Sequence, residues 1–512
     1  MLACTALVGC SNEEDLLNGE QGVESRGEKG YIAVNLNAAN VASRATGYKD
    51  GDVNENAVKR ALFFFFDDEK QAYSVTTDGK SYLEPELDMK SETQDPSIEE
   101  ISDPVLVIEK SKNVPPQYIL AVLNAPSSFE KKNYSLSELE TEIGAYNGDA
   151  TNGFVMTNSV YKHAATGKAV TATEISIDNI CDNDGEGNKD GALDHPVQIY
   201  VERVAAKVEV EAKDNATLFK TGVTFGQTPV YAKILGWNVT NIKNEANLLK
   251  KINTSWTDAA LGFTGWNDAA NFRSYWANTE NTAAPTHPHN WGALNNNVAA
   301  ANYFYENTGA AKSQLLVRAE FVDAQGNSLE NTIAEWYGAK YTFEDLKVAF
   351  ANAVSAKVFI KATEDAKEAT SITDVDIDFF QASDKVSEVA EGRYLCYAKL
   401  AKDSEGKIFV DADGASLNTE AVNNILKAVR PAKIWEAGGY YYFNIDHLGT
   451  AEGLVRNHLY NITVTGISGL GTPVYDPEKI ITPEKPKDDE SYIAAKINIL
   501  AWKVVNQEVE LK

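Results

Sequence analysis

No part of this chain offers a run of about 18 apolar residues, the length that a transmembrane helix needs. Positive charge is also scarce, because 47 lysines and arginines face 74 aspartates and glutamates, for a net charge of −27. Phosphate backbones and anionic membrane surfaces repel a chain with this balance. The sequence therefore predicts no membrane-spanning helix and no nucleic-acid partner.

Residue types that build metal and catalytic sites are few and scattered. The chain has four cysteines and six histidines, and none falls at the spacing of a zinc site. The GxSxG, phosphate-loop and dinucleotide-binding fingerprints are absent. We expect no enzyme, no metal and no cofactor, and we interpret Cys181 and Cys396 as buried thiols. Residues 182–187 imitate the start of a calcium loop, but its twelfth position is Leu193, so we predict a solvated acidic loop over 182–194.

The composition is that of a folded protein, with 43% hydrophobic and 10% aromatic residues among 512. A chain of this length is too long for one hydrophobic core. We predict two domains and leave a third open.

The first ten residues are mostly apolar and end in Leu7-Val8-Gly9-Cys10. This run is similar to the lipobox of bacterial lipoproteins, in which the cysteine is acylated after signal cleavage. We predict a signal peptide at 1–10 and lipidation of Cys10, and a disordered N-terminus is the alternative. No charged region precedes the run, so we expect the signal peptide to begin upstream of Met1. Residues 11–15 resemble the acidic tag of surface-exported Bacteroidetes lipoproteins.

Residues 30–44 alternate as a strand that places Ile32, Val34, Leu36 and Ala38 on one face. Arg44 and Ala45 then open a polar stretch. An exposed arginine between a strand and a loop is a natural protease site, and Arg26 is a second candidate. The alternative is a surface arginine in a hairpin.

Short strands and a few helices fill the rest of the chain. We predict a β-sandwich over 45–213, ending in one long strand at 195–213, and a second over 214–475. A helix at 134–146 has capping-box spacing between Ser135 and Glu138 and an apolar stripe of Leu136, Leu139 and Ile143. Two further helices are predicted at 341–354 and 417–429.

Four tryptophans occupy a loop-rich region between 247 and 308, at positions 256, 266, 276 and 291. Aromatic side chains in loops can bind sugars, and they can equally pack against the edge of a sandwich. Both interpretations stay open at this point.

The chain ends in a charged, proline-containing spacer at 476–490 and an alternating strand at 491–512. The alternation shifts phase near Leu500–Val504, which predicts a bulge or kink between two strand segments. Two hypotheses compete: an ordinary last strand of its own sheet, or a donor strand that completes the sheet of a neighbouring subunit. Donor residues would be Ile493, Ile497, Ile499, Trp502, Val505, Val509 and Leu511.

Seven segments, in order along the chain, carry a resemblance to a known family. They are YILAVLNAP, FVMTNSVY, VERVAAKVEV, FRSYWANT, YFYENT, GLVRNHLYNITVTGISGLGTPVYDP and INILAWKVVNQEVEL. They resemble the fimbrillin family of Bacteroidales, the subunits of type V pili, and most of all the shaft subunit of the minor fimbriae of Porphyromonas. The resemblance implies two transthyretin-like or Greek-key β-sandwich domains in tandem, with a C-terminal donor strand over 476–512.

The resemblance also implies a mode of assembly. A lipoprotein precursor reaches the cell surface and an arginine-specific protease removes a propiece, here 11–44 with cleavage between Arg44 and Ala45. The departing strand, which contains Ile32, Val34 and Leu36, leaves a groove that the last strand of another subunit fills. Its partners would be identical subunits, anchor and tip fimbrial subunits, the protease, and the outer membrane through the lipid of the precursor. The alternatives are a tip or accessory subunit, and a monomeric surface lipoprotein that binds glycans.

Overall fold

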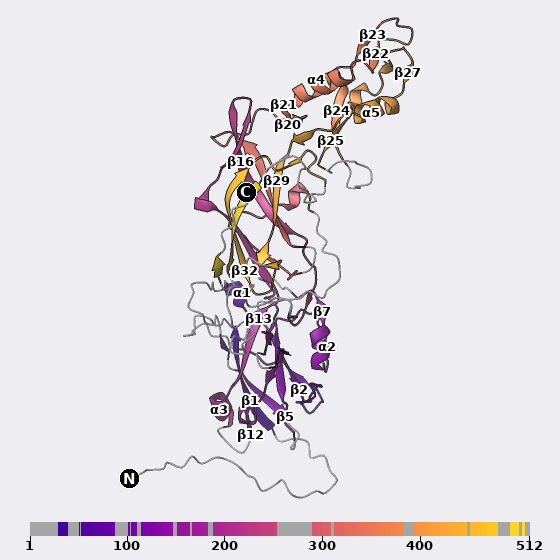
Figure 1. Cartoon of the computed structure of the whole chain (residues 1–512). Coiled ribbons are helices and arrows are strands. Elements are labelled where there is room, and N and C mark those ends of the chain that lie inside the picture. The colour runs from indigo at the N-terminus through magenta and orange to yellow at the C-terminus, as the bar shows by residue number, and fades with distance from the viewer. Residues whose placement is uncertain are drawn as a thin grey trace, which may run out of the picture.

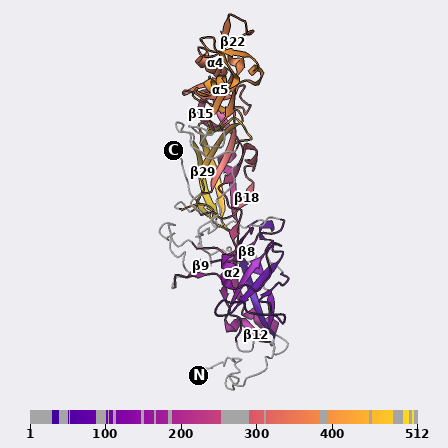
Figure 2. The same ribbon diagram turned by 90° about the vertical axis from the view of Figure 1, so that its right-hand side faces the viewer.

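The structure is a computed structural model, and the chain forms an elongated, mostly β molecule, as the sequence predicts (Figure 1). It describes residues 29–38, 51, 53–87, 101–102, 104–109, 114–146, 151–163, 166–182, 188–252, 289–308, 312–382, 394–447, 451–479, 492–500 and 504–506. An N-terminal β domain lies at one end, a C-terminal sandwich in the middle and a smaller lobe at the other end (Figures 1 and 2). No helix among these residues is long and apolar enough to cross a bilayer.

The N-terminal domain is built on one sheet with the strand order β12-β1-β13-β8-β6-β2-β3. In that order the strands span Ile180–Asp182, Lys29–Ala38, Val197–Arg203, Met156–Asn158, Tyr118–Leu123, Ala61–Phe66 and Tyr82–Leu83. Strands β4 (Ile101–Ser102) and β5 (Val105–Glu109) pair with β1, and β11 (Thr173–Glu174) pairs with β6. Strands β9 (Tyr161–Lys162) and β10 (Ala169–Val170) form a separate hairpin.

Strand β2 is buried on both faces, which explains its continuous apolar sequence ALFFFF. Phe63 and Phe65 join a core that includes β1, while Phe64 and Phe66 join a second core. The sheet therefore has an apolar layer on each side.

Helix α2 (Leu136–Thr141) covers the second of these cores and has the predicted capping box. The Ser135 N–H donates to Glu138 Oε2 at 2.8 Å, and the Glu138 N–H donates to Ser135 Oγ at 3.3 Å. Leu136 and Leu139 are buried as predicted. Ile143 is a wrong prediction, because the helix ends before it and Ile143 lies exposed in β7 (Ile143–Gly144).

The long strand predicted at 195–213 is two strands that belong to different domains. β13 ends at Arg203 in the N-terminal sheet, and β14 (Ala206–Ala212) begins a sheet of the C-terminal sandwich. Between them, the Val204 N–H donates to Val155 O and Ala205 O accepts from the Asn457 N–H. The pairing thus changes domain at Val204–Ala205, whereas the sequence placed the boundary at Lys213.

The C-terminal sandwich packs two five-stranded sheets face to face. One has the order β18-β14-β32-β34-β35, and its other members span Ala301–Phe304, Leu459–Ser468, Tyr492–Leu500 and Val504–Asn506. The other has the order β15-β16-β19-β29-β33, spanning Phe219–Phe225, Thr228–Thr240, Gln314–Val322, Gly438–Asn444 and Thr472–Val474. Alternate side chains of both, such as Val208, Trp237, Val317 and Ile462, form one buried core.

A fourth core lies in what we call the insertion lobe (residues 333–435). In sequence, this lobe is inserted between β19 and β29, which pair with each other in that sandwich. Its strands are β20 (Ile333–Trp336), β21 (Ala339–Thr342), β22 (Phe359–Lys361), β23 (Ala369–Ser371), β24 (Ile377–Gln381), β25 (Cys396–Leu400), β26 (Ile408–Val410), β27 (Ser416–Leu417) and β28 (Lys433–Trp435). Helices α4 (Phe343–Val354) and α5 (Thr419–Lys427) confirm two predicted helices. The lobe is absent from the predicted two-domain division.

The core of the lobe depends on the buried face of α4. Phe350 is fully buried and packs edge-on against Phe379 of β24, with ring centroids 5.0 Å apart, and against Trp336 of β20 at 4.6 Å. Thr342 caps the helix by accepting the Asp345 N–H at 3.0 Å.

We predict that Phe350→Ala lowers the free energy of unfolding of the lobe by about 3–5 kcal/mol, because it leaves a cavity where three elements meet. Limited proteolysis should then cut within 333–435 while the two β-sandwich domains stay intact. Val348→Ala, on the exposed face of the same helix, is the matched control and should leave the cleavage pattern unchanged. Equal protease resistance of the two variants would contradict the role of Phe350.

Candidate functional site

Strand β1 lies inside the N-terminal sheet with a partner along each edge. Its first half runs between β12 and β5, both antiparallel to it. Its second half runs between β13, which is parallel to it, and β4. The Val34 N–H donates to Pro104 O at 3.0 Å between the β5 and β4 pairings. Withdrawal of β1 would open a slot with unpaired backbone groups on both sides.

The side chains of β1 make it part of the domain core. Ile32 and Val34 have no exposed surface and lie in one cluster with Phe63, Leu106 and Ile199. Leu36 continues the strand through its backbone, opposite Ile199 and Ser102. The slot would therefore be apolar as well as unpaired.

The predicted processing residues fall outside the described residues. Arg44 and Ala45 lie between the end of β1 at Ala38 and the next described residue, Gly51. Cys10 and Arg26 precede Lys29 and lie outside as well.

The chain after that gap is anchored where the two sandwiches meet. Helix α1 (Val53–Asn56) carries Glu55, which is only 1% exposed. Its carboxylate pairs with Lys207 Nζ of β14 at 2.8 Å and accepts a hydrogen bond from the Tyr303 hydroxyl of β18. Arg203 Nε of β13 donates to the Glu55 carbonyl at 3.0 Å. One short helix thus bonds to both domains.

The electrostatics of this contact favour the ion pair. Burial alone lowers the pKa of Lys207, but the hydrogen bond and charge of Glu55, together with Glu209 at 3.1 Å, raise it overall. Lys207 therefore stays charged, and each buried charge has an opposite partner.

Two more buried ion pairs surround the junction. Arg456, just before β32, donates through Nε to Glu306 at 3.0 Å and through its terminal nitrogens to the carbonyls of Asn247 and Leu248. Lys250 pairs with Glu202 of β13 at 2.8 Å, and burial lowers the pKa of this lysine although Glu202 opposes the shift. Leu248 belongs to the N-terminal core, so Arg456 also links the domains.

The last strand of the chain pairs with its own subunit in this structure. β34 is antiparallel to β32, with Ile493 opposite Ile467, Ile497 opposite Ile462, and Ile499 opposite Tyr460. The chain then reverses, and Val505 in β35 pairs with Ile499. The phase shift near Leu500–Val504 therefore marks a hairpin and not a bulge. Trp502, Val509 and Leu511 lie outside the described residues.

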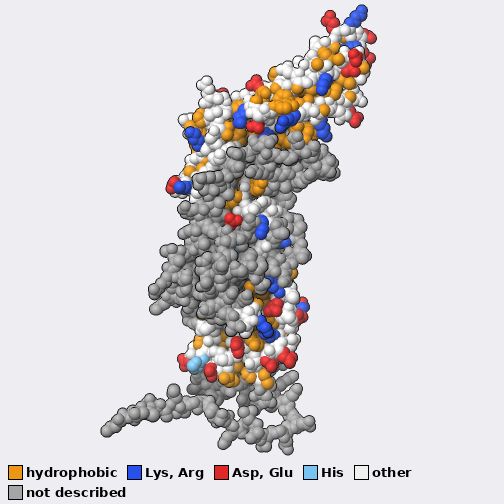
Figure 3. Space-filling view, viewed as in Figure 1, with side chains coloured by type: hydrophobic (Ala, Val, Ile, Leu, Met, Phe, Trp, Pro, Cys, Tyr) orange, Lys and Arg blue, Asp and Glu red, His pale blue; other side chains and the backbone are white. Residues whose placement is uncertain are grey.

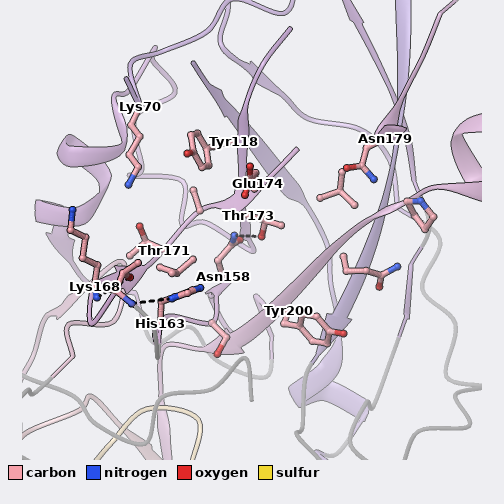
Figure 4. Close-up of a pocket in the computed structure, with 18 residues that line it drawn as sticks. Lys70, Tyr118, Asn158, His163, Lys168, Thr171, Thr173, Glu174, Asn179 and Tyr200 are labelled. Carbon is pink, nitrogen blue, oxygen red and sulfur yellow. Dashed lines mark hydrogen bonds between the residues drawn. The ribbon is translucent and has the colours of Figure 1, made fainter. Parts of the chain in front are cut away.

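A polar pocket of about 590 Å³ opens in the N-terminal domain where β8 ends (Figure 4). There the Asn158 side chain bonds to the neighbouring strands: Oδ1 accepts the Ala121 N–H of β6 at 2.8 Å, and Nδ2 donates to Thr173 Oγ1 of β11 at 3.2 Å. Tyr118 and Tyr200 also line the pocket. Such hydroxyl, amide and ring groups can hydrogen-bond a polar ligand.

Other predicted candidates resolve into structural roles. Trp291 is buried under Arg318, whose guanidinium lies 5.6 Å from the ring, so it is no surface sugar contact. Tryptophans 256, 266 and 276 lie outside the described residues. The prediction of an acidic loop over 182–194 is in part wrong, because Asn188–Asp194 forms helix α3.

The two described cysteines differ in environment. Cys396 is fully buried, which confirms the predicted buried thiol, and burial raises the pKa of this thiol. Cys181 is only half-buried, so the same prediction is wrong for Cys181. The described residues hold no group of three side chains suited to a metal ion.

Comparison with known proteins gives one family match. Residues 436–508 match the family described as "Major fimbrial subunit protein type IV, Fimbrillin, C-terminal". This match confirms the predicted resemblance to fimbrillins, over the region that contains β29, β32, β33 and β34. No curated protein matches the chain.

Three solved structures illustrate the similarity. A fimbrilin (FimA) from Porphyromonas gingivalis W83 is 14% identical, with a TM-score of 0.37 and coverage of 93% of this chain and 98% of that one. A fimbrial assembly protein from Parabacteroides distasonis is 8% identical, with a TM-score of 0.36 and coverage of 93% and 98%. The tip fimbrial protein Mfa3 from P. gingivalis, truncated at its C-terminus, is 11% identical, with a TM-score of 0.27 and coverage of 92% and 99%.

We predict that Glu55→Ala lowers the free energy of unfolding by about 3–5 kcal/mol, because it leaves Lys207 charged and buried without its main partner. Glu320→Ala is the matched control: it removes an ion pair of the same 2.8 Å length, to Lys233, at the surface of the same sandwich, and should cost about 0–1 kcal/mol. Urea unfolding of both variants measures the difference. Similar losses would show that the junction pair contributes no more than a surface pair.

Proposed function

From the fimbrillin match, we propose that this chain is a structural subunit of a bacterial surface fimbria that assembles head to tail by exchange of its terminal strand. The observation that carries the proposal is the position of β1, a strand that precedes Arg44, is paired on both edges and is buried in a core. β1 has 10 residues and β34 has 9. A terminal strand from a second copy therefore matches the slot in length and in apolar alternation.

Exchange replaces a weaker site by a stronger one. On its own subunit, β34 pairs along its length with β32, and along its other edge with only three residues of β35. In the slot left by β1, a strand would find partners along both edges. Each fully buried aliphatic side chain contributes about 1.5–3 kcal/mol, and the ladder of backbone hydrogen bonds adds specificity of register.

Cleavage at Arg44 is the step we propose to release β1. Arg44 lies in the connection between Ala38 and Val53, so a cut there separates β1 from the rest of the chain. Glu55 and its partners hold the new N-terminal segment at the junction. The strand can thus leave while the domains remain joined.

These steps lead to a proposed order of export, cleavage and assembly for the subunit. It reaches the outer membrane as a lipoprotein acylated at Cys10, loses residues 11–44 to an arginine-specific protease, and polymerises with identical subunits between an anchor and a tip subunit. Because a donor strand joins one end of a copy to the other end of the next, the contact is open and builds a filament. A strand that can be donated favours a shaft subunit over a tip subunit.

We predict that an arginine-specific protease converts the purified precursor into multimers with a new Ala45 N-terminus. Non-boiled gel electrophoresis and N-terminal sequencing measure both events. Arg44→Ala should prevent the cut, and a truncation after Glu490 should be cut but remain monomeric, because it lacks β34. Arg26→Ala is the control and should polymerise like the wild type. Multimers of the truncated chain, or a cut wild type that stays monomeric, would contradict strand donation.

A further inference from the structure

The polypeptide that leads from the C-terminal sandwich into the spacer is held by the insertion lobe. β33 ends at Val474, and Tyr475 then enters the lobe, where it packs against the core that includes Phe350 and Phe379. Its ring stacks on Phe343 of α4, with centroids 6.2 Å apart and an interplanar angle of 28°. A residue outside the lobe in sequence thus completes the packing of the lobe.

Two hydrogen bonds, one from the lobe and one from the sandwich, hold backbone groups of the next residues. The Asp476 N–H donates to Gln381 Oε1 at 3.0 Å, from the end of β24 in the lobe. The Pro477 carbonyl accepts from the Trp291 N–H at 3.2 Å, from the side of the sandwich. Residues 475–477, which we call the tail root, therefore lie between the lobe and the sandwich, beside a cleft of about 720 Å³.

The tail root lies at the lobe end of the sandwich. Tyr492, the first residue of β34, is opposite Ser468 at the far end of β32, while Leu500 is opposite Leu459 near the domain junction. Residues 480–491 connect the root to β34, and a chain of this length can span at most about 40 Å. A donated strand would depart from this end, next to the lobe (Figure 1).

We infer that the insertion lobe positions the donor strand: it holds the tail root at a fixed place, so that successive subunits meet at a restricted angle. The inference rests on the proposed function, because it concerns the strand that is donated. With the root held, the connection to the donated strand is limited to the residues after Pro477. With the root free, that connection becomes longer and the joint between subunits loosens.

The surface of the lobe agrees with a role in holding the tail root where the lobe meets the sandwich. Charged side chains of both signs are spread over the lobe, and apolar side chains gather where it meets the sandwich (Figure 3). Tyr475, Phe343 and Gln381 are each only half-buried. The contact is thus small enough to be removed without emptying the core of the lobe.

The test is Tyr475→Ala, compared with Tyr475→Phe and with Tyr337→Ala. Phenylalanine keeps the ring that stacks on Phe343, and Tyr337 is an exposed lobe tyrosine away from the root, 65% exposed. In the uncut monomer, hydrogen exchange of the Asp476 amide should rise about tenfold in Tyr475→Ala alone. In filaments imaged by electron microscopy, the same variant should keep its donor strands but bend more, with a persistence length lower by roughly twofold or more.

The two readouts separate the inference from the proposed function. Unchanged exchange at Asp476 in Tyr475→Ala, or filaments as straight as the wild type, would overturn the positioning role. A wild type that forms no filaments after cleavage would overturn the proposed function, while the exchange measurement on the monomer would still decide whether the lobe holds the root. Equal loosening by Tyr475→Phe would also overturn the inference, because it would assign the effect to the hydroxyl.

Discussion

Pairing of β1 on both edges is the constraint on which the N-terminal domain depends. An internal strand satisfies backbone groups of two neighbours at once, so its loss leaves two open edges and an apolar floor. Here β1 comes first among the described elements, and Ala38 is followed within a short stretch by Arg44. The domain is therefore complete only while that position in the sheet is filled, whichever chain fills it.

The buried ion pairs at the junction would keep the two domains connected if β1 were lost. Glu55, Lys207 and Arg203 connect α1 to one strand of each sandwich, and Arg456 reaches across to Leu248. Buried ion pairs add little net stability compared with apolar packing, but they are costly to break one partner at a time. They connect the two domains through contacts that do not involve β1, so the proposed release of β1 would leave these contacts in place.

The sequence predicted those elements that have a regular pattern of apolar residues or a fixed residue spacing. Alternation located β1 and β34, and the spacing of Ser135 and Glu138 located α2. It did not separate β13 from β14, because Val204, Ala205 and Ala206 continue the apolar pattern across the domain change. Glu55 and Lys207 were missed because a buried charge looks like a surface charge until its partner, far away in sequence, is known. The insertion lobe was missed for a related reason: its strands are short, and only the pairing of β19 with β29 shows that 333–435 is an insertion.

The same residues decide how the terminal strand can act. β34 runs from the lobe end of the sandwich to the junction, so on its own subunit it covers an edge of β32 along nearly the full domain. An exposed edge of that length would be open to nonspecific pairing. Under the proposed strand exchange, β34 would cover this edge of β32 until a slot with partners along both edges is available in another copy, and a held tail root would let the strand leave without disturbing β33. A C-terminal segment that is first held on its own subunit and then donated would need two opposite properties. Its strand must be able to detach, and its root must stay attached. The chain separates them at the spacer, with Tyr475 on one side and Tyr492 on the other.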